Sequence, residues 1–291
     1  RKTIDDFPHH QPLLMLCIEW LRNEPPEVVE PIIRKLIELN PADAWAIREL
    51  GFFLLKQRRY EQAEQCANEA GRLDPKHNAY HHLRGELSAA EGRMPEARRE
   101  FREAVKLSVD NEYTLSSLLR CCDTPGERRE ELKFILEELV TQVIYGDGLL
   151  AWRNLAHNEL EPQEILRSLQ DALQEPPDLW HVWSAIITQL LAMNRLDEAA
   201  EQAKQATERF PLLPRLWLDR ATVARYQNDL AEEQRSLEAA YRINPAWGEA
   251  LRQLSEIHIR KGEFEKAKSI LEGAIVRDPL DPPAEPHGRG L

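Results

Sequence analysis

The segment from residue 44 to residue 75 decides the fold: AWAIRELGFFLLKQRRYEQAEQCANEAGRLDP. Its first half places apolar residues at helical spacing, and its second half puts Ala63, Ala67 and Ala70 on one stripe. A polar stretch, Gln57–Arg59, separates the two halves. Pro75 ends the pattern, because proline cannot continue a helix. The segment therefore predicts two short helices joined by a polar turn.

The same pattern returns along the chain with a period of 34 residues. Prolines at 41 and 75 are one period apart, and so are those at 177, 211, 245 and 279. Three periods separate Pro75 from Pro177, so one phase runs through the middle of the chain. This phase defines eight windows: 10–43, 44–77, 78–111, 112–145, 146–179, 180–213, 214–247 and 248–281. A single helix pair cannot bury its apolar face, whereas stacked pairs can, so the period predicts a helical solenoid.

Small residues recur at fixed places in these windows. The eighth position holds Gly51, Gly85, Ala221 and Ser255, and the twentieth holds Ala63, Ala97, Ala199 and Ala267. The twenty-seventh is alanine in six windows: Ala70, Ala104, Ala172, Ala206, Ala240 and Ala274. Side chains no larger than a methyl group let helix backbones approach closely. The pattern therefore indicates helix geometry rather than chemistry.

In these motifs the chain resembles the tetratricopeptide repeat family. The resemblance rests on Leu50-Gly51, on YEQA at 60–63, LDP at 73–75, LDEAA at 196–200 and GEFEKA at 262–267, and it covers 10–281. It implies an all-α, right-handed superhelical solenoid of about eight helix-turn-helix repeats, with the first helix of each repeat on the concave face. We expect residues 1–9 to form a lead-in and residues 282–291, rich in Pro and Gly, to form a tail.

Windows 112–145 and 146–179 depart from the family pattern. The residues that replace the small ones are Leu119, Arg153, Glu131 and Ile165. Apolar spacing continues in both windows, so we interpret them as divergent repeats. Larger side chains should widen the helix crossings there, which predicts a local change of curvature over residues 112–179.

Composition narrows the classes of partner. The formal net charge is -12, which disfavours nucleic acid because phosphate neutralisation needs clustered Lys and Arg. No apolar run is long enough to cross a bilayer, so we expect no membrane partner. The four cysteines, at 17, 66, 121 and 122, form no Cys-x-x-Cys pair, and no signal peptide is visible. Reduced thiols and a cytoplasmic location are expected.

Three local motifs could in principle bind a ligand or a metal, but each is better explained by a structural role. Gly146 and Gly148 could cradle a phosphate, but such a loop follows a strand, and here a helical pattern precedes it, so we predict a turn between repeats. Cys121-Cys122 lacks the further ligands that zinc needs, which predicts small buried thiols. Trp183 and Trp217 share the fourth window position, which predicts core packing. No metal or cofactor is expected.

Candidate binding residues follow from the resemblance. It implies that window positions 2, 5, 9 and 12 face a ligand, and the residues at these positions form the candidate set: Trp45, Arg48, Phe52, His82, Glu86, Tyr113, Ser116, Arg120, Asp123, Asn154, His157, His181, Ser184 and Thr188. Asp147, Arg215 and Thr222 occupy the same positions. Family members that bind a C-terminal carboxylate carry Lys, Asn and Arg at set positions, and the ninth position here holds no such set, which disfavours that class.

These observations predict a non-catalytic scaffold that binds a protein or peptide segment in the concave groove. The open ends of a solenoid also permit self-association. Two alternatives stay open. The chain could be the scaffold region of a larger multidomain enzyme whose catalytic domain lies outside residues 1–291, since it begins at Arg1. His, Asp and Cys residues of windows 78–179 could instead form a hydrolytic or metal site.

Overall fold

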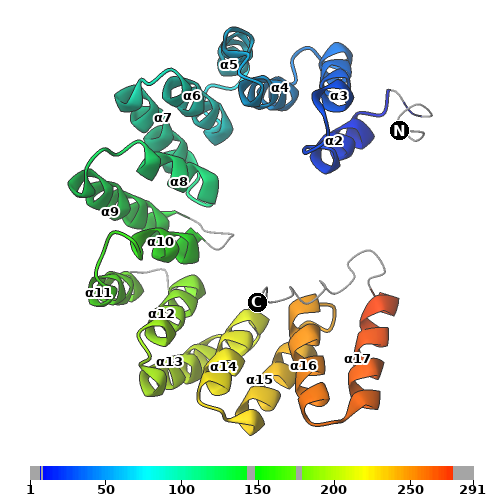
Figure 1. The fold of residues 1–291 in the computed structure, drawn as a ribbon, viewed down its shortest axis with the longest axis vertical. Helices are drawn as coiled ribbons and strands as arrows, with labels where there is room; N and C mark the ends of the chain where they lie inside the picture. Colours follow the sequence, from blue (N-terminus) through cyan, green and yellow to red (C-terminus); the bar gives the residue numbers. More distant parts are fainter. Residues whose placement is uncertain (1–6, 8, 143–147, 175–178, 278–291) are drawn as a thin grey trace. The chain divides into compact units, whose positions relative to one another are not determined.

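The chain folds into helices alone over the residues that the structure, a computed structural model, describes: 7, 9–142, 148–174 and 179–277 (Figure 1). These residues contain sixteen α-helices and no strand. The helices divide between two compact units, unit 1 at Arg1–Leu155 and unit 2 at Ala156–Leu291. The prediction of an all-α helical repeat solenoid is confirmed. The expected lead-in and tail lie largely or wholly outside the described residues.

Each unit is a series of helix-turn-helix pairs. Unit 1 contains α2 (Gln11–Trp20), α3 (Pro26–Leu39), α4 (Ala44–Lys56), α5 (Tyr60–Leu73), α6 (Asn78–Ala90), α7 (Met94–Leu107), α8 (Glu112–Arg120), α9 (Pro125–Thr141) and α10 (Gly148–Ala156), which ends at the boundary. Unit 2 contains α11 (Pro162–Leu173), α12 (Trp180–Ala192), α13 (Leu196–Arg209), α14 (Pro214–Tyr226), α15 (Leu230–Ile243), α16 (Gly248–Arg260) and α17 (Phe264–Arg277). None of these helices combines the length and apolar character that a bilayer crossing requires.

In five helix pairs, α4–α5, α6–α7, α12–α13, α14–α15 and α16–α17, the turn contains one residue in the left-handed backbone conformation. These residues are Arg58, Gly92, Asn194, Asn228 and Gly262, with φ between 56° and 77°. Within each unit they recur every 34 residues. Glycine and asparagine tolerate this conformation best, which explains four of the five. The turn therefore repeats in backbone conformation as well as in sequence.

Small residues lie where helices meet, as the sequence predicts. A Cβ atom added at Gly85 would lie 2.6 Å from the ring of Phe101, so a larger side chain there would displace α7 from α6. Ala63, Ala97 and Ala199 are completely buried. Backbone proximity at these points explains the recurrence of small side chains.

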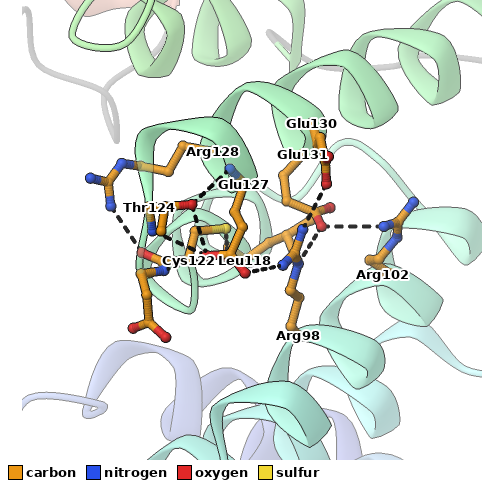
Figure 2. A network of polar contacts seen from close by, with 10 residues as sticks. Arg98, Arg102, Leu118, Cys122, Thr124, Glu127, Arg128, Glu130 and Glu131 are labelled. Atoms are coloured by element: carbon orange, nitrogen blue, oxygen red, sulfur yellow. Dashed lines mark hydrogen bonds and ion pairs between the residues drawn. The ribbon is translucent and has the colours of Figure 1, made fainter.

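The pair α8–α9 departs from this arrangement. Glu131 occupies the place of the alanine and is completely buried, and it accepts hydrogen bonds from Arg98 (2.5 Å) and Arg102 (3.2 Å) of α7, as Figure 2 shows. Thr124 and Glu127 form a capping box that starts α9 at Pro125. The backbones of α8 and α9 are close over a shorter length than those of α6 and α7. The change of curvature over residues 112–179 stays a prediction, and Gly146 and Asp147 lie outside the described residues.

The tryptophans differ from expectation. Trp152 of α10 has the largest completely or almost completely buried side chain, and its indole N–H donates to the Leu132 carbonyl at 2.7 Å. Trp183 and Trp217 are only half-buried, so the prediction that they pack in the core is wrong. The Trp217 indole N–H donates to the Pro211 carbonyl at 2.9 Å, at the turn that precedes its helix. The counterparts of these two tryptophans at the fourth position of other windows, Ile47, Leu115, Leu149 and Leu251, are buried, so the two tryptophans are less buried than the position usually is.

Candidate protein-binding groove

A cavity of about 630 Å³ lies in unit 1, between first helices of successive pairs. We call it the unit 1 groove. Side chains from α2, α3, α4, α6, α8 and adjoining turns line it: Ile18, Arg22, Asn23, Val29, Ile33, Glu49, Phe52, Phe53, Lys56, Ala79, His82, Glu86, Asn111, Tyr113, Ser116, Ser117 and Arg120. Aliphatic and aromatic groups thus share one surface with carboxylates, amides and guanidinium groups.

Six candidate residues from the sequence line this groove together. They are Phe52 of α4, His82 and Glu86 of α6, and Tyr113, Ser116 and Arg120 of α8. All lie at window positions 2, 5 or 9, and the constant period keeps these positions on the same side of successive first helices. The sequence therefore predicts which residues converge here, and their role in binding stays a proposal.

Other unit 1 candidates do not line the groove. Arg48 is only 5% exposed, and its guanidinium lies 3.4 Å from the Asp74 carboxylate at the end of α5. Trp45 is half-buried and packs against the hydrophobic cluster that α2 to α6 form together. Asp123 is exposed in the turn after α8, and the exposed Asn154 accepts a hydrogen bond from Arg153 at 3.0 Å. The expectation that Arg48 is available to a ligand is wrong, because its ion pair faces α5.

The candidate residues of α12 in unit 2 are buried or half-buried. His181 and Ser184 are 6% and 1% exposed, so the expectation that they face a ligand is wrong. The His181 ring stacks on Trp180, with 3.7 Å between ring centroids. Thr188 is half-buried, and its hydroxyl donates to the Ser184 carbonyl at 2.9 Å. Apolar residues surround these positions in α12, so this face is buried. His157 is exposed in the turn after α10, and Arg215 and Thr222 bond to Asp219 and Leu218 within α14.

Glu86 is the centre of the polar part of the unit 1 groove. The Ser117 hydroxyl donates to its carboxylate at 2.6 Å, and the Arg120 guanidinium donates at 3.2 Å. Arg120 also donates to the Ser117 hydroxyl at 2.7 Å. These bonds join α6 to α8 and hold three polar groups in fixed positions. Sequence reasoning missed Ser117, although it lies directly beside the candidate Ser116.

His82 lies between the polar and aromatic parts of the groove. Its Nδ1 is 2.8 Å from the Thr114 hydroxyl, and its ring centroid is 5.6 Å from Phe52 and 5.5 Å from Phe101. Burial lowers the pKa of His82, an effect that the Glu86 carboxylate opposes and the Arg120 guanidinium reinforces. The fold therefore favours the neutral imidazole.

A pH dependence follows for the stability of unit 1. Because the pKa of His82 is lower in the folded chain than in the unfolded one, the unfolded chain binds more protons below about pH 6.5. The stabilisation is present above that pH and is lost as the pH falls through the folded pKa. We expect the free energy of unfolding to fall less between pH 7.5 and pH 5.5 in His82→Gln than in the native chain. Equal pH dependence in denaturant titrations would contradict this.

Further lining residues were missed because they lie in turns or outside the family's ligand positions. Arg22 follows α2 and pairs with Glu49 of α4 at 3.3 Å. Burial raises the pKa of Glu49, and Arg22 opposes that shift. Asn111 is the N-cap of α8 and accepts from the Tyr113 N–H at 3.1 Å. Its capping role could be predicted from the sequence, since Asn precedes a helical pattern there.

Cys121 and Cys122 are buried, as predicted, with 7% and 4% of each residue exposed. The Cys122 thiol donates to the Leu118 carbonyl at 3.6 Å. Burial raises the pKa of Cys122 to about 11. In the part of the chain that the structure describes, no three His, Cys, Asp or Glu side chains converge as a metal ion requires.

These thiols should resist alkylation. A thiol of pKa about 11 holds about one thiolate in a thousand at pH 8, and the thiolate is the nucleophile. We expect iodoacetamide to modify the half-buried Cys17 before Cys122 in the native chain, and to modify both alike in denaturant. Mass spectrometry of digests measures this. Equal rates in the native chain would show that Cys122 is accessible.

Comparisons with known proteins agree with this architecture. Two family models, both described as tetratricopeptide repeat, match residues 30–87 and 185–246. A search of curated proteins by sequence found no match.

Solved structures similar to the chain include PilF of Pseudomonas aeruginosa, at 14% identity over 82% of this chain and 93% of that chain, with a TM-score of 0.37. YrrB, described as a TPR protein with an unusual peptide-binding site, is 18% identical over 76% and 96%, with a TM-score of 0.32. PilW, described as a type IV pilus biogenesis factor, is 13% identical over 82% and 94%, with a TM-score of 0.40. Likeness at this level supports no argument about function.

The family assignment thus rests on the chain itself and on the matched family models. The 34-residue period, the paired helices and the left-handed turn residues agree with both matched segments, one in each unit. The chain therefore contains tetratricopeptide repeats, which the family models match at residues 30–87 and 185–246.

Proposed function

We propose that the unit 1 groove binds a peptide segment of a partner protein and that the chain acts without catalysis of its own. Tetratricopeptide repeats support a role as a protein-interaction scaffold, and both matched family models are repeat models. One observation supports the location most strongly: six residues chosen from repeat positions line a single cavity of about 630 Å³. Cavities of this size suit a few ligand side chains.

The groove offers two kinds of contact. Phe52 and Phe53 of α4 provide apolar surface for a ligand side chain, and both are only half-buried. Glu86, Ser117 and Arg120 provide hydrogen-bonding groups that already hold one another in place. Preorganised groups lose little conformational entropy when a ligand binds, which favours affinity.

Tyr113 and Arg120 are the side chains best placed to contribute binding energy. Tyr113 is 81% exposed at the rim, and the Arg120 side chain is 70% exposed. Tyrosine and arginine are enriched among the residues that dominate binding energy at interfaces. Because both side chains are largely exposed, we expect their replacement to keep the fold, although replacing Arg120 removes its bonds to Glu86 and Ser117.

A peptide selected from a display library for binding to the full chain provides the ligand that tests this proposal. We expect Tyr113→Ala and Arg120→Glu each to weaken binding of a selected peptide by about tenfold or more in calorimetry. The matched control is Tyr226→Ala, which removes a 58% exposed tyrosine of unit 2. Loss in the control alone, or unchanged affinity in both groove variants, would refute the location.

A further inference from the structure

One basic side chain of the unit 1 groove, Lys56, forms no ion pair with any residue that the structure describes. Three basic residues line the groove: Arg22, Lys56 and Arg120. Two acidic residues line it as well: Glu49 and Glu86. Arg22 pairs with Glu49 at 3.3 Å, which accounts for one carboxylate. Arg120 pairs with Glu86 at 3.2 Å, which accounts for the other. The groove therefore has a local excess of positive charge, although the whole chain carries a net charge of -12.

Lys56 lies beside the aromatic part of the groove. It is the last residue of α4 and is exposed. Phe52 and Phe53 precede it by four and three residues, so its Cβ atom lies about 5–6 Å from theirs on the helix surface. Lys56 affects Glu49 only from a distance: burial raises the pKa of Glu49, and Arg22 opposes that shift more strongly than Lys56 does. The charge of Lys56 is therefore available to a ligand that contacts the two phenylalanines.

Arg22 extends this positive edge into the preceding helix pair. Arg22 and Lys56 both occupy position 13 of their windows, one period apart, so successive repeats place them on the same edge of the groove. The Arg22 guanidinium donates to Glu49 through Nη2, and a guanidinium has five N–H donors in all. Arg22 can therefore bond a ligand carboxylate without releasing Glu49.

We infer that the segment bound in the unit 1 groove carries an Asp or Glu side chain that pairs with Lys56, and an apolar side chain that packs on Phe52 and Phe53. This inference rests on the proposed function, because it names the chemistry of the ligand in the same groove. The apolar side chain excludes water from the ion pair and so strengthens it. Because Lys56 lies about one helical turn from the phenylalanines, the two ligand residues are about two positions apart in an extended segment, or about three or four in a helical one.

The existing ion pairs disfavour a basic ligand residue. Glu49 and Glu86 are already neutralised by arginines, so a ligand cation would compete with groups that are held in place. Lys56 would also repel that cation. A chain-terminal carboxylate is disfavoured for another reason: lysine is a point charge on a flexible stem and lacks the planar, two-donor geometry that holds a carboxylate in one orientation. A side-chain carboxylate requires only a single charge beside the apolar contact.

The sequences of peptides selected from a random display library on the full chain give the first test. We expect them to share an Asp or Glu about two to four residues from an aromatic or aliphatic residue. Synthetic copies with an amidated C-terminus should keep their affinity, since a side chain supplies the carboxylate. Enrichment of Lys or Arg in place of Asp or Glu, or loss of binding on amidation, overturns the inference.

Charge reversal at Lys56 gives the second test. In calorimetry with a selected peptide, we expect Lys56→Gln to weaken binding by about threefold and Lys56→Glu by about tenfold or more. A peptide whose acidic residue is replaced by Lys should bind Lys56→Glu more tightly than it binds the native chain. The matched control is Lys76→Glu, which makes the same charge change at an exposed lysine of unit 1 outside the groove lining and should bind normally. Equal losses in Lys56→Glu and Lys76→Glu, or no rescue by the Lys peptide, overturn the inference.

The outcomes distinguish this inference from the proposed function. If Tyr113→Ala and Arg120→Glu weaken binding and Lys56→Glu does not, the segment binds in the groove and its pairing with Lys56 is wrong. If none of the three variants weakens binding, the location of the binding site is wrong as well.

Discussion

Replacing Trp152 with alanine is expected to lower the free energy of unfolding of the helices around α10 by about 3–5 kcal/mol. The indole is 1% exposed, and its N–H donates to the Leu132 carbonyl of α9 at 2.7 Å. Alanine would leave a cavity and would also remove the hydrogen bond that joins α10 to α9. Hydrogen exchange of the full chain, followed by mass spectrometry, measures the loss in peptides from α9 and α10.

Two further variants separate the causes. Trp152→Phe keeps most of the apolar volume and loses the hydrogen bond, so we expect a smaller loss of about 1–2 kcal/mol. Trp20→Ala removes the same side chain where it is 81% exposed and should leave local stability nearly unchanged. If Trp152→Ala behaved like Trp20→Ala, the packing of α10 against α9 described above would be incorrect.

Replacing Arg98 with methionine is expected to destabilise α7–α9 by about 2–4 kcal/mol. Arg98 donates to the completely buried Glu131 and also lies 3.0 Å from Glu127 (Figure 2). Without it, Glu131 keeps only Arg102, at 3.2 Å, as a charged partner. A buried carboxylate that loses a partner is costly, because water cannot replace the lost hydrogen bonds. Local hydrogen exchange of α9 measures the effect.

A second substitution should reverse much of this loss. Glu131→Leu removes the buried charge, and the next pair carries the fully buried Ile165 at the equivalent position. We therefore expect Arg98→Met with Glu131→Leu to be more stable than Arg98→Met alone, since an apolar replacement of a buried ion pair is often neutral or stabilising. A double variant less stable than the single variant would show that the cost of Arg98→Met is not electrostatic.

The fold was predictable because its signals are local and periodic. Proline spacing sets the phase, alanine stripes mark helix contacts, and Gly92 and Gly262 mark the turns. The choice of Phe52, Glu86 and Arg120 followed from that phase together with the ligand-facing positions that the family resemblance implies, and the structure places all three in one cavity. Each of these features depends on positions that recur at one fixed period, so the sequence carries it directly.

Burial within a repeat was harder to predict, because it depends on which neighbour covers each face. Trp152 and Trp217 each lie in the first helix of a repeat. Only the structure shows that Trp152 is buried and Trp217 half-buried. The partners of Glu131 lie on α7, about thirty residues away, and no local pattern indicates them. His181 and Ser184 occupy ligand-facing positions of the family, but apolar neighbours in α12 bury them.

Site-specific photocross-linking is the most direct test of whether a partner segment binds in the unit 1 groove. A photoreactive phenylalanine derivative placed at Tyr113, on the groove rim, would be compared with the same group at Tyr226 in unit 2; both native side chains are exposed. We predict that a selected peptide becomes cross-linked at position 113 and not at position 226, and that excess unlabelled peptide prevents it. Cross-linking at position 226 alone, or equally at both, would contradict the assignment of the groove.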